Sequence, residues 1–290
     1  MTNYIDAHHH LWDLSAVRYT WLMEKGVRRF FGDPTSIQRD YLLDEHRQSA
    51  SRHGFARSVH IQVGVVDALE EAMWVDAVAT ANPDWPMKQV VFCDLTAPTR
   101  SAQLEAFQQL SSVVGVRQIV GRSAAEDAQT DTNTLIADPA FLDGLQEVAA
   151  RGMRFDLQLT PPLIEATARL FEKIPNLPVA LCHAGSPHDR SNAGLSTWSQ
   201  ALQHLSALPQ FCCKISGLGM FHHGWRGDVF RPIVETCLEQ FGAERCMFGS
   251  NFPVCSLTSD YATLFDAIRT LVPVDMQAQV FSRTAEKFYF

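Results

Sequence analysis

The sequence lacks any polybasic run, and its charge balance is acidic. Its 24 Lys and Arg residues stand against 32 Asp and Glu residues, which gives a formal net charge of -8 at pH 7. Nucleic acids and anionic membranes are bound through clusters of Lys and Arg, so we expect neither as a partner. A small-molecule substrate is the partner that this composition favours. The oligomeric state stays open, a homo-oligomer included.

Paired cysteines and long apolar stretches are also missing. The cysteines number seven, which is odd, and they form no Cys-x-x-Cys motif. No stretch approaches the roughly 18 consecutive apolar residues of a membrane helix, and no charged segment followed by an apolar one opens the sequence. We therefore expect a cytoplasmic protein. Five cysteines lie in apolar runs, which predicts buried, reduced thiols: Cys93, Cys182, Cys212, Cys213 and Cys246.

Eight short apolar runs, separated mostly by helical patterns, make up the rest of the chain. With 290 residues, 46% of them hydrophobic, the sequence has the size of one large α/β domain. The alternation predicts a single (β/α)8 TIM barrel over residues 1–290. Residues 14–54 exceed a minimal connection and predict an extra loop and helix near the barrel mouth. The predicted strands are 4–8, 56–62, 90–93, 114–119, 154–159, 179–183, 211–216 and 246–249.

Polar side chains stand at the ends of these runs. The carboxyl ends of the strands of such a barrel converge on one mouth, so residues far apart in the sequence meet there. We therefore predict the functional site at this mouth. The residues are His8, His10, His60, Gln62, Asp94, Arg117, Asp156, Gln158, His183, Lys214, Ser216, Ser250 and Asn251.

The segment Asp6-Ala7-His8-His9-His10 is the most specific motif. Residues two apart in a strand face the same side, so His8 and His10 can converge on one ion while His9 points away. The alternative is a polar strand end or the remnant of a purification tag. The position of the triplet inside a strand-like run favours the metal-binding interpretation.

Two further residues interrupt apolar runs. His183 ends one run just before Gly185, which favours a place at the mouth, whereas the alternative is a core histidine with a hydrogen-bond partner. Lys214 is a charge inside a predicted strand, and such a charge pairs with an acid or meets an anionic group. A structural ion pair with Asp156 or another acid is the alternative to a role in the site.

Substrate-binding candidates come from several strand ends and one loop. Arg117 could clamp a substrate carboxylate, and a salt bridge inside the barrel is almost as good an explanation. His60 and Gln62 end the second run. His223 and Trp225 lie in a glycine-rich loop, which could equally be an ordinary surface loop.

Four motifs in order resemble the amidohydrolase superfamily: Asp-Ala-His-His-His, His-Ala-Gly-Ser-Pro, Lys-Ile-Ser-Gly-Leu and Met-Phe-Gly-Ser-Asn-Phe-Pro-Val. They are most similar to the amidohydrolase-related (amidohydrolase 2) group of TIM-barrel hydrolases, which includes sugar-acid lactonases and pyrone-dicarboxylate lactonase. The resemblance implies a His-x-His pair at His8 and His10, a later histidine at His183, and an acid after the eighth strand. Here Asn251 replaces that acid, and it cannot accept a proton. Arg117 stands where binuclear members carry a modified lysine.

The first hypothesis is therefore hydrolysis of a lactone, or a related cyclic ester, of a sugar acid or carboxylated small molecule. One divalent ion, zinc before others, would be held by the metal ligands His8, His10 and His183, while metal-free catalysis by cationic side chains is the other route. The alternatives are a metal-dependent non-oxidative decarboxylase and a degenerate barrel that only binds a ligand. We expect catalytic roles for His183, Asp156, Lys214 and Asn251, and substrate-binding roles for His60, Gln62, Arg117, His223 and Trp225.

Overall fold

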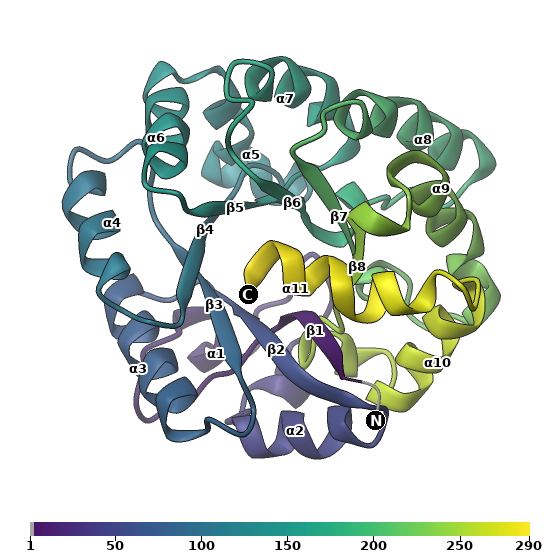
Figure 1. Ribbon diagram of the computed structural model, residues 1–290, viewed down its shortest axis with the longest axis horizontal. Coiled ribbons are helices and arrows are strands. Elements are labelled where there is room, and N and C mark those ends of the chain that lie inside the picture. The colour runs from purple at the N-terminus through teal and green to yellow at the C-terminus, as the bar shows by residue number, and fades with distance from the viewer. Residues whose placement is uncertain (1–2) are drawn as a thin grey trace.

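Eight parallel strands form a nearly closed barrel in this protein, whose computed structural model describes residues 3–290 (Figure 1). Each strand pairs with the next in sequence order, from β1 to β8. The predicted (β/α)8 barrel is thereby confirmed. The strands are β1 (Tyr4–His9), β2 (Phe55–Ile61), β3 (Met87–Phe92), β4 (Val113–Ile119), β5 (Arg154–Gln158), β6 (Val179–Leu181), β7 (Phe211–Ile215) and β8 (Cys246–Phe248).

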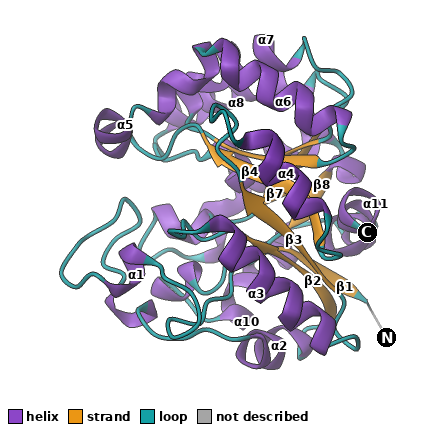
Figure 2. Cartoon of the chain, turned by 90° about the vertical axis from the view of Figure 1, so that its left-hand side faces the viewer, coloured by secondary structure: helices purple, strands orange, loops and turns teal. Residues whose placement is uncertain are grey.

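The helices surround the strands, as the two views show (Figures 1 and 2). Between residues 3 and 290, none combines the length and apolar character that crossing a membrane would require. They are α1 (Thr20–Met23), α2 (Leu43–Ser51), α3 (Ala68–Ala81), α4 (Arg100–Gln108), α5 (Ala124–Thr130), α6 (Pro139–Ala150), α7 (Ile164–Phe171), α8 (Asn192–Ser206), α9 (Arg231–Phe241), α10 (Tyr261–Leu271) and α11 (Thr284–Tyr289).

Strand β5 shows how alternate side chains serve two different cores. Phe155 is fully buried, and its ring lies 6.2 Å from that of Phe141 in α6 and 6.0 Å from that of Phe171 in α7, measured between centroids. The next residue, Asp156, faces the barrel interior and contacts Lys214 of β7. Because side chains alternate along a strand, apolar residues pack against the helices while polar ones enter the interior.

Two strand boundaries differ from the sequence prediction by more than one residue. Strand β3 begins at Met87, before the predicted start at Val90, because the buried amide of Gln89 is hydrogen-bonded to its neighbours and can lie inside a strand. Strand β6 ends at Leu181, so His183 follows the strand and is not part of it. The left-handed backbone of His183, with φ of 55°, turns the chain out of the sheet there.

The ring of strands closes between β1 and the segment that follows β8. The backbone N–H of Asn251 donates to the carbonyl oxygen of His8 at 2.7 Å. The backbone N–H of His10 donates to the carbonyl oxygen of Phe252, also at 2.7 Å. The seam of the barrel therefore coincides with two histidines and the asparagine that the sequence singles out.

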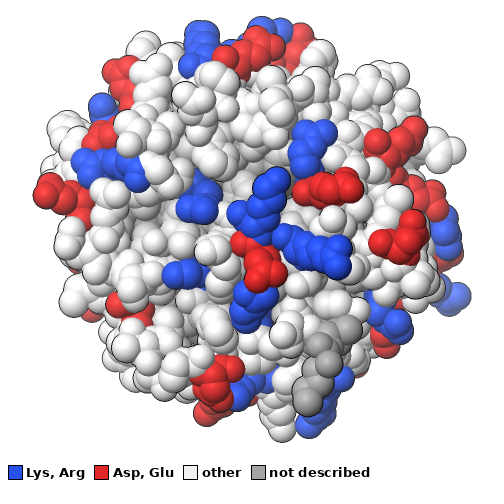
Figure 3. Space-filling model, viewed as in Figure 1, with Lys and Arg blue, Asp and Glu red and all other residues white. Residues whose placement is uncertain are grey.

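Helix α11 covers the barrel end opposite the mouth. It crosses the ring in Figure 1, and in Figure 2 it lies at the opposite end of the molecule from α1 and α5. Phe288 and Tyr289 pack in the interior core with Ile5 of β1. On this face basic side chains gather near the centre around acidic ones (Figure 3), and Arg57 pairs with Glu286 at 3.0 Å. These contacts seal the interior at this end.

A buried ion pair stands inside the barrel above α11. Lys214 Nζ lies 2.5 Å from Asp156 Oδ2, and both side chains are fully buried. The hydroxyl of Tyr289 donates to the other carboxylate oxygen at 2.7 Å, and Lys214 Nζ is 4.8 Å from the centre of the Tyr289 ring. The structural ion pair that the sequence left open for Lys214 is therefore present.

All seven cysteines are free thiols, including the five predicted to be reduced. Four of the five predicted to be buried are so, while Cys212 is only half-buried. It is the second residue of β7, near the barrel end that α11 covers. Packing there is less complete than at the middle of a strand.

Replacement of Tyr289 by Phe should lower the free energy of unfolding by about 1–3 kcal/mol, because a buried oxygen of Asp156 loses its donor. The control is Tyr4→Phe, since the Tyr4 hydroxyl makes no hydrogen bond within residues 3–290. Chemical denaturation of both variants measures the difference. Equal stability of the two variants would contradict the role assigned to Tyr289.

Replacement of Lys214 by Met should cost about 3–5 kcal/mol of stability, because it leaves the Asp156 carboxylate buried without a counter-charge. Adding Asp156→Asn in the same chain should restore much of that loss. Breaking the exposed pair of Arg169 and Glu165 with Arg169→Met should change stability by less than about 1 kcal/mol. A double variant no more stable than Lys214→Met alone would rule out the ion-pair explanation.

Candidate active site

A cavity of about 390 Å³ opens at the carboxyl ends of the strands. The long connection after β1, which includes α1, forms part of its wall, as the length of residues 14–54 predicts. Of the site residues predicted from the sequence, the cavity is lined by His10, Gln62, Arg117, Gln158, His183 and Asn251.

An irregularity in β1 sets the directions of three consecutive histidines. The pairing register of β1 with β2 shifts between Asp6 and His9. The His9 ring leaves the interior and stacks on His46 of α2, with 3.9 Å between ring centroids. His8 and His10 turn inward, with their ring centroids 5.2 Å apart. A strand irregularity thus re-aims side chains beside a site, and the divergence of His9 agrees with the sequence prediction.

Within residues 3–290, His8 has no hydrogen-bond partner on either ring nitrogen, although it is fully buried. Its ring centroid lies 4.6 Å from that of His183. Burial, together with the nearby His183 and Lys214, holds the pKa of His8 well below its usual range. A neutral imidazole with a free lone pair is the form that binds a metal ion.

His10 joins β2 to the segment after β8. Its Nδ1 lies 2.8 Å from the carbonyl oxygen of Ile61, so Nδ1 carries the proton and donates. Burial lowers the pKa of His10 to about 3, so Nε2 bears a lone pair. That atom is 3.0 Å from Asn251 Oδ1, while the Asn251 amide nitrogen faces Cys255 Sγ at 3.5 Å. Two acceptor atoms at this distance indicate either a cation bound between them or an Asn251 amide rotated so that its nitrogen donates to His10.

His183 is held in a strained backbone conformation. Its φ of 55° is rare for a residue with a side chain, and Nδ1 lies 3.0 Å from the hydroxyl oxygen of Ser216. A Cβ atom at Gly217 would come within 2.5 Å of His183 Nδ1, so only glycine leaves room for the ring. Burial, followed by the charge of Arg117, keeps the pKa of His183 well below its usual range. The histidine is therefore neutral and fixed in orientation.

Arg117 is a buried cation without an acidic partner. It is 5% exposed, its Nη1 donates to the carbonyl oxygen of Gln62 at 3.3 Å, and its Nη2 donates to the side-chain oxygen of Gln158. Its Nε has no hydrogen-bond partner, and no carboxylate pairs with it among the described residues. The internal salt bridge considered from the sequence is therefore not formed. A buried guanidinium in this state is suited to bind an anion.

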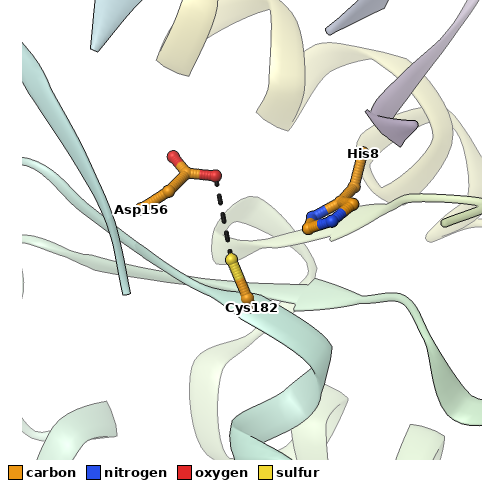
Figure 4. A group of neighbouring side chains, drawn as sticks. All are labelled: His8, Asp156 and Cys182. Atoms are coloured by element: carbon orange, nitrogen blue, oxygen red, sulfur yellow. Dashed lines mark hydrogen bonds between the residues drawn. The ribbon is translucent and has the colours of Figure 1, made fainter. Parts of the chain in front are cut away.

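A group that could hold a metal ion lies just below the cavity wall: His8, Asp156 and Cys182, with ligand atoms within 4.8 Å of one another (Figure 4). It differs from the predicted set, since His10 and His183 are not in it. Burial raises the pKa of Cys182 to about 12, so its thiol keeps the proton and donates to Asp156. With both its oxygens engaged, Asp156 faces Lys214 and Tyr289, and neither Asp156 nor Lys214 lines the cavity.

Three other residues predicted for substrate binding stand away from the cavity wall. His60 accepts a hydrogen bond from the backbone N–H of Leu11 at 3.1 Å, and its Nε2 is 3.7 Å from Glu71 Oε1, outside the ring of strands. The Trp225 indole lies against Thr258. His223 reaches only the rim, where Nε2 donates to a backbone carbonyl at 2.8 Å.

Most of the outer cavity wall was not anticipated from the sequence. The long connection after β1 was expected near the mouth, but irregular loops carry no periodicity that tells which side chains face inward. The adjacent cations and aromatic rings in Arg28-Arg29-Phe30-Phe31 were the one available signal. The additional wall residues are Thr20 and Trp21 of α1, Ile119 of β4 and, outside the helices and strands named above, Glu24, Arg29, Phe30, Phe31, Val63, Gly64, Arg122, Met220 and Val254.

Known proteins resemble this chain along nearly its whole length. A Sinorhizobium fredii protein named y4mH, of uncharacterised function, is 32% identical over 98% of this chain and 97% of its own length. An L-fucono-1,5-lactonase from Burkholderia multivorans is 26% identical over 92% of this chain and 86% of its own length.

Solved structures share the fold. An amidohydrolase from Burkholderia multivorans with bound zinc superposes with a TM-score of 0.83 and 24% identity, covering 99% of each chain. A Pseudomonas putida protein described as a putative 2-pyrone-4,6-dicarboxylic acid hydrolase gives a TM-score of 0.75 at 18% identity, over 100% of this chain and 98% of its own. The model of the amidohydrolase family matches residues 5–290. The chain is therefore a member of the amidohydrolase family and a hydrolase.

Proposed function

We propose that this protein hydrolyses a lactone of a sugar acid or of another carboxylated small molecule. The proposal rests on Arg117, a buried guanidinium without an acidic partner in a cavity that also presents His10, His183 and Asn251. Such a cation stabilises the negative charge that develops on a carbonyl oxygen under attack. The two L-fucono-1,5-lactonases at 26% identity make a lactone the first choice of substrate.

The proposed reaction begins with attack of water on the lactone carbonyl carbon. As the new C–O bond forms, the carbonyl oxygen gains charge and is bound by Arg117. The ring C–O bond then breaks, the ring oxygen takes up a proton, and a hydroxy acid leaves. Where no ion is bound, His183 and His10, which burial keeps neutral, accept hydrogen bonds from the attacking water, Asn251 orients it through its amide, and its proton passes to the ring oxygen.

One divalent ion, zinc before others, is part of the proposal. His8 offers unpartnered nitrogens, and the close approach of His10 Nε2 and Asn251 Oδ1 fits a shared cation. These residues and His183 would hold the ion without a carboxylate from the segment after β8. A divalent ion polarises a carbonyl group and lowers the pKa of bound water. Arg117 supplies carbonyl polarisation with or without it.

Replacement of Arg117 by Met should lower kcat/KM for the best lactone about 100- to 1000-fold, because a charge that stabilises the developing oxyanion is removed. Arg117→Lys should retain part of the activity. Proton release from a panel of sugar-acid lactones measures turnover, and Arg57→Met, at the opposite barrel end, is the control. Full activity of Arg117→Met would contradict the proposed mechanism.

Replacement of Asn251 by Asp should raise the affinity for zinc, because a charged oxygen then joins the neutral ligands. Chelator competition with metal analysis measures this, and Asn251→Gly serves as control, since glycine accepts the φ of 56° at this position. We expect Asn251→Gly to reduce lactone turnover modestly and His183→Ala to reduce it far more. Equal loss in these two variants would show that Asn251 does more than orient water.

A further inference from the structure

We propose that Arg29 binds a second anionic group of the substrate at the outer rim of the cavity, so that the substrate is a lactone bearing an additional carboxylate. This inference rests on the proposed function and narrows its substrate class. It assigns specificity to a segment that we call the strap, residues 26–33 of the long connection after β1.

The strap is fixed across the mouth at two points. Its tip is a tight turn in which Arg29 and Gly32 exchange backbone hydrogen bonds of 2.8 and 2.9 Å. The carbonyl oxygen of Phe31 accepts a hydrogen bond from His223 at 2.8 Å, on the loop after β7. The backbone N–H of Phe30 donates to Glu126 Oε1 at 3.1 Å, on α5. The strap therefore holds its side chains at a defined place on the cavity wall.

The carboxylate of Glu126 also lies close to two guanidinium groups. Its Oε2 lies 3.3 Å from Arg29 Nη2 and 3.9 Å from Arg122 Nε. Both arginines line the cavity, whereas Glu126 does not. One carboxylate shared by two cations neutralises neither fully, and each guanidinium carries five N–H donors. The arginines therefore retain capacity for another anion.

The charges on the cavity wall also favour binding of an additional anionic group. Three guanidinium groups line it, those of Arg29, Arg117 and Arg122, against the single carboxylate of Glu24. Among the residues that line the cavity, positive charge is therefore in excess, inside a chain whose formal net charge is -8. A local excess of this sign attracts and orients an anionic substrate.

The positions of the arginines separate two tasks. Arg117 lies deep, beside His183, and Arg29 comes from the rim, where its guanidinium lies 5.7 Å from the centre of the Trp21 ring. The aromatic face and the shared carboxylate hold the Arg29 guanidinium at the rim. A carboxylate is the planar anion that a guanidinium binds through two parallel hydrogen bonds. Hydrolysis of such a lactone gives a dicarboxylate, because ring opening adds one carboxylate and releases one proton.

Binding of two open-chain probes tests the inference without any turnover. D-glucarate carries carboxylates at both ends and D-gluconate at one, and titration calorimetry measures the affinity of each. Arg29→Gln should weaken glucarate binding about tenfold or more, the effect of losing a charge-assisted hydrogen bond of 1.4 kcal/mol or more, and should leave gluconate binding unchanged. Arg28→Gln is the matched control, because Arg28 is exposed and does not line the cavity; it should change neither.

Glu126→Gln provides a change of opposite sign. The amide oxygen can still accept from Phe30 N–H, while the negative charge beside Arg29 and Arg122 is removed, so glucarate should bind several-fold more tightly. Equal affinities of the unmodified protein for glucarate and gluconate would overturn the inference. So would a loss in Arg29→Gln that is the same for both probes, since that result indicates only a disturbed strap. Thermal unfolding of each variant identifies such a disturbance.

A kinetic comparison separates this inference from the proposed function. The monolactone of glucaric acid should show a raised KM and an unchanged kcat in Arg29→Gln, whereas gluconolactone should show neither effect. Arg29-dependent binding of glucarate by a protein that hydrolyses no lactone would refute the proposed function and leave the anion site standing. Lactone hydrolysis that does not distinguish the two substrates would refute the anion site and leave the proposed function standing.

Discussion

Closure of the barrel is the constraint on which the site depends. A ring of eight strands must join its last strand to its first, and here the join is made by backbone hydrogen bonds from Asn251 to His8 and from His10 to Phe252. The left-handed backbone of Asn251 lets one residue both close the ring and direct its amide at His10. Asparagine adopts this conformation more readily than most residues. The residue that departs from the family pattern is therefore also part of the seam.

Inside the cavity, burial keeps the histidines neutral, and arginines supply the positive charge. The three interior histidines lie where a proton is too costly to hold, so they offer lone pairs and no charge. Positive charge comes instead from arginines, which stay protonated when buried. Neutral bases beside fixed cations suit a reaction in which an oxygen becomes negative. The same division explains why the ion pair of Lys214 and Asp156 can stand below the cavity as part of the barrel's framework.

The sequence was informative wherever local geometry determines the outcome. Strand periodicity predicted the barrel, the divergence of His9 from His8 and His10, and a mouth that contains His10, Arg117, His183 and Asn251. It did not distinguish the two roles weighed for Lys214, because its partner Asp156 is 58 residues away in the chain and the choice depends on interior packing. His60 was misjudged as a wall residue, because the alternation of side chains in β2 sends it outward to Glu71. Loop side chains such as Arg29 follow no period, and only their tertiary contacts place them.

The seam between β1 and the segment after β8 has a consequence for the growing chain. His10 and Asn251 are 241 residues apart, and a ribosome adding about 5–20 residues per second needs roughly 12–48 s to bring the second after the first. Throughout that interval β1 presents an unpaired backbone edge, the kind of surface through which strands of different chains associate. Chaperones would cover this edge during the interval, and slow expression at low temperature would change the length of the interval. It ends only when the eighth strand emerges.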